Sequence, residues 1–463
     1  MVALTGCFHP SPPEGAACAN GTDCPDPLIC DLGVCVRSPH VIDADVDAPP
    51  DVAIDANLTC SCAGATLTCG GVAPVTCALG CMPQNPGARC LEVDPSNGVG
   101  ITAASGLTMN ITINSGIATF NTETGAVSGA FTRAAGQGIN AGVAFELRTT
   151  GTQLIGVWTF HRLGLNSGAT IRFTGARSAV FVSGTDVAIA GTIDGSGGCY
   201  GADAACAGPG GGIGGSTAAA KGCGPGGAGA ASMQGTDDGG GGGGGGRGAG
   251  GAGGLGGSMA TGGTAGGACV AAIAEPLVGG AGGGAGSPGA VTPCKGGGGG
   301  GALQITAVDT ITVDGTITMG GSGGEGGKLD PAFTNAGAGC GGGAGGTILV
   351  EARTIAVGTT GVIAANGGGG GGGGSLGITG GRGGSGGLSA TPAVGGSAAS
   401  GNASAGGPGA AGTVPAASSP TAVSNAGGGG GGIGAVYVRT TPGNFMQGGL
   451  VTPAAGSGPL RTQ

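Results

Sequence analysis

Short runs of alternating apolar and polar residues begin near position 109 and become dense after position 143. Examples are Phe145-Glu-Leu147, Ile171-Arg-Phe173 and Val187-Ala-Ile189. Each run ends at glycine, serine or asparagine, which are residues that favour turns. Alternation over so few residues is typical of short β-strands with one buried face. The pattern therefore predicts an all-β protein built from many short strands.

The strand pattern itself is repeated along the chain. Three copies and the start of a fourth occupy Val180–Ile193, Leu303–Ile317, Ile348–Ile363 and Ile433–Val438. In this alignment Val182 matches Ile305, which lies 123 residues later. Each copy offers three short strands that cannot bury an apolar face alone and that gain stability by stacking on the next copy. We therefore expect a parallel β-helix or a similar solenoid over residues 93–463.

Glycine-rich tracts separate the copies, at about 199–301, 319–346 and 366–432, and glycine makes up 123 of the 463 residues. Repeat proteins place insertions on one face, so we expect the tracts to project from one corner of the coil. Collagen is excluded because runs such as Gly239–Gly246 lack the Gly-X-Y period. Flexible loops remain one alternative. Packed extended helices with three residues per turn are the other alternative, and we favour partial order of this kind, since cysteine cross-links would offset the large ordering cost of glycine.

Two small cysteine-rich modules, residues 8–38 and 59–92, precede the predicted solenoid. They are too short to fold on a hydrophobic core alone. Residues 39–58 between them carry five aspartates among prolines and small residues. This composition is typical of an extended, solvated linker. A calcium loop of the EF-hand type is the alternative, but its glycine and its terminal glutamate are missing.

The seventeen cysteines form even-numbered groups once Cys7 is set aside. Such groups on loop-rich segments are typical of disulfide-bonded proteins in oxidising compartments. Zinc is the alternative, but paired cysteine knuckles with histidine are lacking, so we expect disulfides, no metal, and an exported protein. Connectivity within each group stays open. The groups are Cys18, Cys24, Cys30 and Cys35; Cys60, Cys62, Cys69, Cys77, Cys81 and Cys90; and Cys199, Cys206, Cys223, Cys269, Cys294 and Cys340.

Cys7 ends the sequence Leu4-Thr5-Gly6-Cys7, which resembles the lipobox of bacterial lipoproteins. In that family the chain is cut before this cysteine, which is then acylated. The resemblance implies that residues 1–7 are the end of a signal whose beginning lies upstream, and that Cys7 carries a lipid. The alternative is an unmodified cysteine near the N-terminus.

Charge and hydropathy exclude several kinds of partner. The net charge is −9 and the pI about 4.7, so the chain lacks the basic surface that binds nucleic acid or anionic lipid. No stretch approaches the roughly 18 apolar residues of a membrane-spanning helix. We therefore expect contact with a membrane through a lipid anchor only. Hydrophobic residues make up 39% of the chain, which argues against a solvated, disordered chain.

The most serious candidate for catalysis is a pair of acidic residues. Asp186 and Asp309 occupy matching positions of the first two copies. Stacked carboxylates on adjacent coils would bind calcium or act as an acid and base pair in a polysaccharide lyase or hydrolase. The third copy has Thr354 there, so we prefer turn-capping side chains. We assign no catalytic residue and no cofactor, with calcium only under the enzyme alternative.

Cys7, the aspartate-rich linker, the cysteine modules and the Val/Ile repeat beside glycine tracts together resemble glycine-rich surface lipoproteins of myxobacterium-like bacteria. The segment Phe160–Gly198 is similar to the β-solenoid unit of such proteins. The resemblance implies an outer-membrane or cell-surface location. We expect a structural or adhesive protein that contacts matrix, polysaccharide, other cells or solid surfaces. The alternatives are an enzyme on acidic polysaccharide and a protein that binds ice or mineral through flat glycine arrays.

Overall fold

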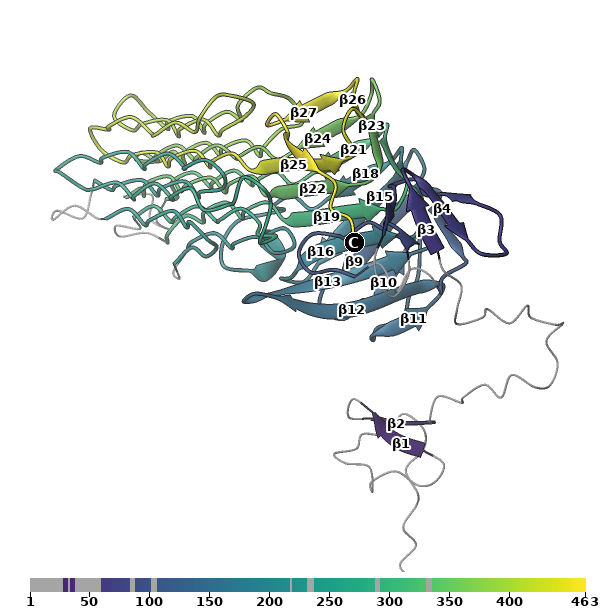
Figure 1. Cartoon of the computed structure of the whole chain (residues 1–463). Helices are drawn as coiled ribbons and strands as arrows, with labels where there is room; N and C mark the ends of the chain where they lie inside the picture. The colour runs from purple at the N-terminus through teal and green to yellow at the C-terminus, as the bar shows by residue number, and fades with distance from the viewer. Residues whose placement is uncertain are drawn as a thin grey trace, which may run out of the picture. The chain divides into compact units, whose positions relative to one another are not determined.

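The computed structural model describes residues 28–31, 34–37, 60–83, 88–100, 106–216, 219–230, 237–287, 292–329 and 335–463. Within this part of the chain, regular structure is almost entirely β, with one short 3₁₀ turn, η2 (Ala204–Cys206) (Figure 1). The predicted all-β class is confirmed. The chain divides into two compact units, one of residues 1–76 and 81–89, the other of residues 77–80 and 90–463. Cys7, Cys18, Cys24 and the linker 39–58 lie outside the described residues.

The cysteine-rich segments form three small antiparallel sheets or hairpins. In the first hairpin, Cys30 and Cys35 are partners in the backbone register. Three disulfides, Cys60–Cys69, Cys62–Cys81 and Cys77–Cys90, join the next group of cysteines. The strands are β1 (Leu28–Asp31), β2 (Val34–Arg37), β3 (Cys60–Ala63), β4 (Thr66–Cys69), β5 (Val75–Thr76), β6 (Cys81–Met82) and β7 (Arg89–Cys90).

The second unit contains three larger sheets. In spatial order, the eight-stranded sheet consists of β11 (Gly138–Asn140), β12 (Val143–Thr150), β13 (Gln153–Phe160), β16 (Ser178–Ser183), β19 (Ala302–Ala307), β22 (Thr347–Glu351), β25 (Ala435–Thr440) and β28 (Gly456–Pro459). The seven-stranded sheet consists of β10 (Val127–Gly129), β9 (Gly116–Asn121), β15 (Ala169–Thr174), β18 (Thr192–Asp194), β21 (Thr316–Thr318), β24 (Val362–Ala364) and β27 (Leu450–Thr452). The six-stranded sheet consists of β26 (Phe445–Gln447), β23 (Thr354–Val357), β20 (Thr310–Val313), β17 (Val187–Ile189), β14 (Arg162–Leu165) and β8 (Asn110–Ile113).

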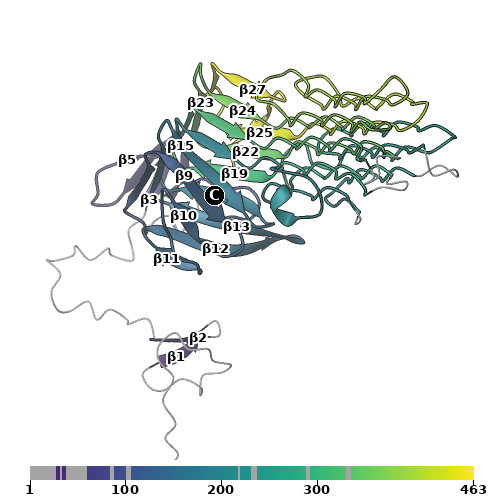
Figure 2. The same ribbon diagram turned by 180° about the vertical axis from the view of Figure 1, so that it is seen from behind.

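The chain visits these sheets in a fixed order. From β16 onward, each three consecutive strands enter the eight-, six- and seven-stranded sheets in turn, and each strand pairs in parallel with its counterpart three strands earlier. The successive rounds are visible from the front and from behind (Figures 1 and 2). The predicted parallel pairing of the repeat copies is confirmed. Antiparallel pairs occur at the N-terminal end, where β9 pairs with β10 and β11–β12–β13 form a meander.

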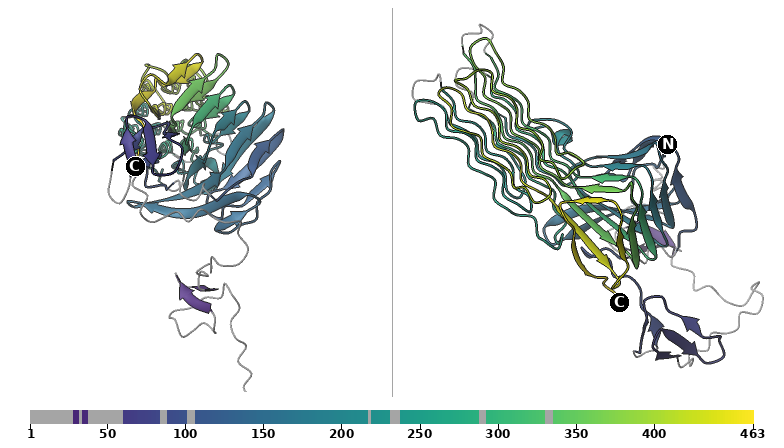
Figure 3. Two further views of the ribbon diagram at one scale, coloured as in Figure 1. Left: turned by 45° about the vertical axis from the view of Figure 1, so that its right-hand side comes forward. Right: turned by 90° about the horizontal axis from the view of Figure 1, so that it is seen from above.

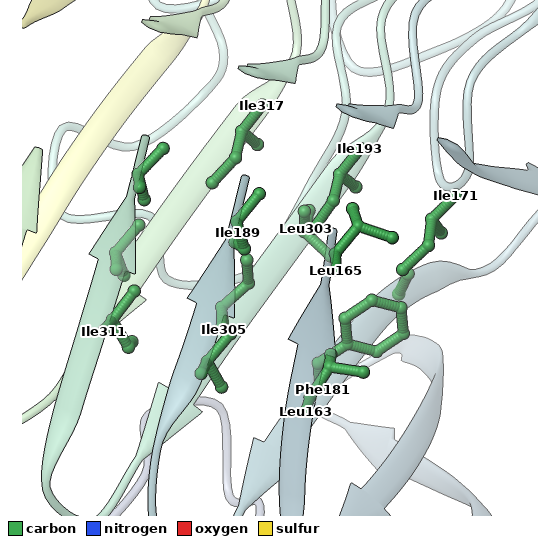
Figure 4. Packing of buried hydrophobic residues seen from close by; sticks show 14 of the residues in the cluster. Leu163, Leu165, Ile171, Phe181, Ile189, Ile193, Leu303, Ile305, Ile311 and Ile317 are labelled. Atoms are coloured by element: carbon green, nitrogen blue, oxygen red, sulfur yellow. The ribbon is translucent and has the colours of Figure 1, made fainter. Parts of the chain in front are cut away.

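The main core lies between the three sheets and consists of columns of side chains. Parallel pairing aligns Phe181 with Ile305, Ile305 with Val350, and Val350 with Val438. All four side chains are fully buried. Corresponding columns run through the other two sheets, so that isoleucines and leucines from successive rounds lie side by side (Figure 4). Each round thus buries its apolar face on the next.

The first rounds are filled by aromatic rings rather than by the aliphatic side chains that the repeat predicts. Trp158 and Phe181 pack edge to face with ring centroids 5.8 Å apart, and Phe120 lies 5.4 Å from Trp158. Phe145 and Phe160 are also fully buried in this cluster. An aromatic ring buries more area than an isoleucine. Together with Phe173, the cluster gathers six of the chain's twelve aromatic side chains at one end of the core.

The register of the first two copies differs by one residue from the sequence alignment. Phe181, not Val182, pairs with Ile305. A register error of one residue normally moves the apolar side chains of a strand to the solvent-exposed face, so the hydrophobic pattern reveals the error. Here all six residues of β16 are buried, because Phe181 faces the main core and Val182 belongs to a second cluster on the other face. Apolar residues on both faces left the register undefined by pattern alone.

Candidate functional site

The glycine tracts all leave the sheets at the same place, between the seven-stranded and the eight-stranded sheet. The first tract joins β18 to β19, the second joins β21 to β22, and the third joins β24 to β25. Each tract runs back and forth in nearly straight segments that project to one side of the sheets (Figure 3). We call this set of segments the glycine bundle.

The backbone of the run 239–246 shows how the glycine bundle is held together. Successive residues donate hydrogen bonds to three different segments, and every third residue returns to the same one: 224–230, 248–254 or 339–342. The N···O distances in this run lie between 2.8 and 3.1 Å. A repeat of three residues, with φ outside the positive region, is that of the polyproline II helix.

The carbonyl groups of the same run accept from three further segments, 263–269, 281–287 and 429–432. The run 239–246 therefore has six hydrogen-bonded neighbours, and every one of its backbone N–H and C=O groups has a partner. Its neighbours come from all three tracts. In the described residues the tracts thus form packed extended helices rather than flexible loops, which is more order than the partial order expected from the sequence.

Glycine is required in the bundle because the segments approach one another through their backbones. A Cβ atom on Gly243 would overlap the carbonyl oxygen of Gly430, and one on Gly341 would overlap that of Gly242. Glycine pays a large entropic cost on ordering, and the complete hydrogen bonding of the runs offsets it.

Disulfides tie the bundle at several points. Cys223–Cys269 links two segments of the first tract, Cys199–Cys206 closes a short loop, and Cys294–Cys340 joins the first tract to the second. The prediction of disulfides is therefore confirmed for both groups of six cysteines, each of which pairs within itself. Disulfides in this number indicate an extracellular or exported protein.

The turns at the far end of the bundle carry several large, exposed apolar side chains. We call the segments 255–260, 375–378, 399–403 and 423–425 the distal turns. Met259 is 89% exposed, Val423 72% and Leu376 70%. Ser258 and Met259 have φ angles of 49° and 62°, in the left-handed region that non-glycine residues rarely adopt. The bundle places these side chains far from the sheets, since eight residues such as 367–374 span about 25 Å in this conformation.

A hollow of about 300 Å³ lies among the distal turns. Its lining is rich in amide, hydroxyl and carboxylate groups. The lining residues are Asp237, Asn335, Ala336, Ser375, Leu376, Asn402, Ser424 and Asn425. Asp237 belongs to the first tract, Asn335 to the second, and Asn402 and Asn425 to the third. The hollow therefore exists only when the three tracts are assembled.

Asp238 lies next to this hollow and is fully buried. Ser287 Oγ donates to its Oδ1 over 3.0 Å, whereas its Oδ2 has no hydrogen-bond partner. Burial raises the pKa of Asp238 to about 6, and the neighbouring charge of Asp237 adds to the increase. A carboxyl group in this setting changes its charge in mildly acidic solution.

The structure does not bring Asp186 and Asp309 into matching positions. Val187 pairs with Ile311, so Asp309 lies one residue out of step with Asp186. Each carboxylate instead faces an arginine of an adjacent round, with Asp186 3.9 Å from Arg162 and Asp309 3.3 Å from Arg353. All four side chains are substantially exposed. The predicted equivalence of the two aspartates is wrong, for the same reason of register as at Phe181.

In the described part of the chain, no group of three or more histidine, cysteine or acidic residues is placed to hold a metal ion. Nor do the described residues include a helix long and apolar enough to cross a membrane. The fold and disulfides define the class as an exported, disulfide-bonded β-protein. No family model, no curated protein and no solved structure matches this chain.

The distal turns were not singled out from the sequence, although a signal for them exists. Within the tracts, larger side chains such as Met259, Leu376 and Val423 interrupt stretches of glycine and other small residues, in which the longest glycine runs, 239–246 and 367–374, have eight residues. At such a spacing each interruption marks the end of one extended run. Which turns lie together depends on backbone pairing, and glycine side chains carry no pattern that specifies it.

Proposed function

We propose that the three sheets form a three-sided β-solenoid that carries the glycine bundle as a rigid projection. The support is the order of the strands, in which every round enters the same three sheets and stacks on the one before. The bundle continues this order, since its segments take their neighbours from all three tracts. In this arrangement the solenoid is a support and the distal turns are the part presented outward.

We propose that the protein is a surface-anchored adhesive protein and that its distal turns make the contact. The observation that carries this proposal is the position of the highly exposed Met259, Leu376 and Val423 beside a polar hollow at the far end of the bundle. Exposed apolar groups beside amides and hydroxyls suit the matrix polysaccharides and cell surfaces expected as partners. The left-handed conformations of Ser258 and Met259 add support, because strained residues cluster at binding sites.

The location proposed for this activity is the outer membrane or cell surface. The disulfides support export. The lipobox-like sequence before Cys7 supports a lipid anchor there, on a residue outside the described part of the chain. Mass spectrometry of the native protein tests the anchor, and an unmodified Cys7 would exclude it.

Adhesion is tested by adsorption of the purified chain to matrix polysaccharide and to cells, measured by quartz-crystal microbalance. We expect a triple variant, Met259→Ser, Leu376→Ser and Val423→Ser, to lose affinity about tenfold, because a few central apolar side chains dominate most interfaces. A matched control replaces exposed apolar residues of the sheet region, Met109→Ser, Ile139→Ser and Leu154→Ser. Equal losses in the two triple variants, or no loss in the first, would exclude the distal turns as the contact.

A further inference from the structure

A second hollow lies on the outer face of the eight-stranded sheet, away from the main core. Residues 92–94 pair antiparallel with 461–463 there, with Asp94 N 3.0 Å from Arg461 O. Together with the segment 274–277, they cover the outward side chains of the sheet and form a second apolar cluster. The outer hollow opens at the edge of this cover, with a volume of about 550 Å³. It is lined by Asn97, Gly98, Thr150, Gly151, Thr152, Gln153, Glu275, Pro276 and Arg461.

A buried carboxylate sets the orientation of the side chains behind the outer hollow. Glu351 is 1% exposed, and its Oε2 accepts hydrogen bonds from Gln304 Nε2, Thr306 Oγ1 and Ser96 N at 2.9, 2.9 and 3.1 Å. An oxygen that accepts three hydrogen bonds has no room for a proton of its own. Burial raises the pKa of Glu351, but a proton on its other oxygen leaves these three bonds in place. The amide nitrogen of Gln304 is therefore fixed toward Glu351.

The orientation of Gln304 determines that of Asn97. Gln304 Oε1 faces outward and accepts from Asn97 Nδ2 at 3.0 Å. The carbonyl oxygen Oδ1 of Asn97 consequently points away from Gln304. Asn97 is 5% exposed, and its Oδ1 has no hydrogen-bond partner. A buried acceptor without a partner costs about 1 to 3 kcal/mol, which a ligand donor would recover after a small side-chain movement that uncovers the oxygen. Gln153 Oε1, from another residue of the same lining, is also buried and unpartnered.

The charged groups of the outer hollow are already paired with one another. Glu275 Oε2 lies 2.7 Å from Arg461 Nη2, and Glu275 Oε1 lies 3.2 Å from Arg439 Nη2. Neither an anionic nor a cationic ligand would find a free counter-charge in the lining. The polar groups of the lining that are not used in these ion pairs are Asn97 Oδ1, Gln153 Oε1, the hydroxyl of Thr152 and the remaining N–H groups of Arg461. The Arg461 side chain is 41% exposed. These are neutral acceptors together with donors.

We propose that the outer hollow binds a neutral saccharide unit. Neighbouring hydroxyls of a sugar both donate and accept, which matches two unpartnered acceptors beside hydroxyl and guanidinium donors. The volume falls in the range of about 300 to 1,000 Å³ found for small-molecule sites. Pro276 is the one apolar ring in the lining, so polar contacts rather than aromatic stacking govern recognition. The site is separate from the distal turns and does not depend on their role.

The test uses the purified full-length chain and three neutral disaccharides, maltose, cellobiose and lactose, in saturation-transfer NMR and calorimetric titration. We expect at least one to bind, and Gln153→Met to weaken it about tenfold, the equivalent of one hydrogen bond. Gln153 is half-buried at the end of a hairpin, so this variant keeps the fold. Asn97→Ala should weaken binding at least as much. Gln447→Met, on an exposed strand of another sheet, is the matched control and should bind normally.

Three results would overturn the proposal. They are the absence of binding for all three disaccharides, equal binding by wild type and the Gln153→Met variant, and binding of acetate or spermidine in place of the sugars. The triple variant of the distal turns should bind the disaccharide as the wild type does. Loss of disaccharide binding in that variant would also overturn a separate site.

Discussion

At the scale of single residues, the chain contains two buried acids in different settings. Glu351 is surrounded by donors, so each of its oxygens has partners even though burial raises its pKa. Asp238 is equally buried but has one oxygen without a partner, and its nearest charged neighbour is another acid, Asp237. The hydrogen bond from Ser287 therefore offsets only part of the cost of ionising Asp238, and the rest lowers the stability of the fold.

Asp238 should make the stability of the glycine bundle depend on pH. Its pKa is about 6 in the folded chain and 3.8 in the reference state, so the folded state holds a proton between these values that the unfolded state has released. Stability from this group is present below pH 4 and falls as the pH rises to about 6, by up to about 3 kcal/mol. Asp238→Asn has no proton to lose. The difference in free energy of unfolding between variant and wild type, measured by denaturant titration from pH 4 to 8, should therefore shift in favour of the variant as the pH rises; parallel curves would contradict this.

At the scale of elements, strands and glycine runs follow different rules. The position of a strand such as β19 is determined by its side chains. Leu303, Ile305 and Ala307 lie in the main core, and the buried Gln304 and Thr306 donate hydrogen bonds to Glu351. The position of a glycine run is determined by its backbone hydrogen bonds, because the three-residue period directs successive N–H groups to different neighbouring segments. The effect of a glycine substitution on the stability of the bundle therefore depends on the space beside that glycine, not on the hydropathy of the new side chain.

Two adjacent glycines test this rule. A Cβ on Gly266 would overlap Gly224 O, whereas nothing lies within 4 Å of a Cβ on Gly267, which is exposed and has no positive φ. We expect Gly266→Ala to lower the free energy of unfolding by about 1 to 3 kcal/mol through overpacking. Gly267→Ala should be neutral or stabilising by up to about 1 kcal/mol, because alanine reduces the entropy of the unfolded chain. Thermal unfolding followed by circular dichroism compares them, and similar melting temperatures would argue against tight backbone packing.

The difference between strands and runs also explains what the sequence predicts well. Short strands, parallel repeats and cysteine groups are recognisable because side chains such as Ile305, Ile311 and Ile317 recur in order. The register at Phe181 was missed because both faces of its strand are apolar. The six neighbours of the run 239–246 could not be predicted from the sequence, because one glycine is chemically identical to another and carries no information about its partner. For the same reason the sequence contained no indication that turns from three tracts meet around the distal hollow.

At the scale of the whole molecule, cross-links between tracts matter more than those within a loop. Cys294–Cys340 spans 46 residues and joins the first tract to the second, whereas Cys199–Cys206 spans seven. Loop-closure entropy assigns about 4 kcal/mol to the longer link and about 2 kcal/mol to the shorter one. The longer link is also buried, in contact with Ala285 of another run.

We therefore expect the double variant Cys294→Ala, Cys340→Ala to lose more stability than Cys199→Ala, Cys206→Ala. Alanine is used because a serine hydroxyl would be buried at Cys206, Cys294 and Cys340. Denaturant unfolding measures both free energies under the same conditions. If the short local link proves the more costly to remove, the assembly of the tracts does not depend on the link between them.

The outer hollow shows a different use of the whole fold. Its lining combines residues near position 97, the β12–β13 turn, a loop of the first glycine tract and the last residues of the chain. These segments are far apart in the sequence and come together only when all rounds of strands have formed. A local sequence pattern therefore cannot predict the hollow. Glu351, Gln304 and Asn97 come from three separate parts of the chain and together fix one oxygen atom.

The three-residue period of the glycine bundle restricts how its length can change. Adding three residues to a run advances the chain by about 9 Å and restores every N–H to its former direction, whereas adding one or two turns each N–H toward the wrong neighbour. Growth or shortening of the bundle therefore proceeds in steps of three residues, matched between neighbouring runs. Between the steps only the turns are free to vary, so the reach of the projection and the chemistry at its end can change independently.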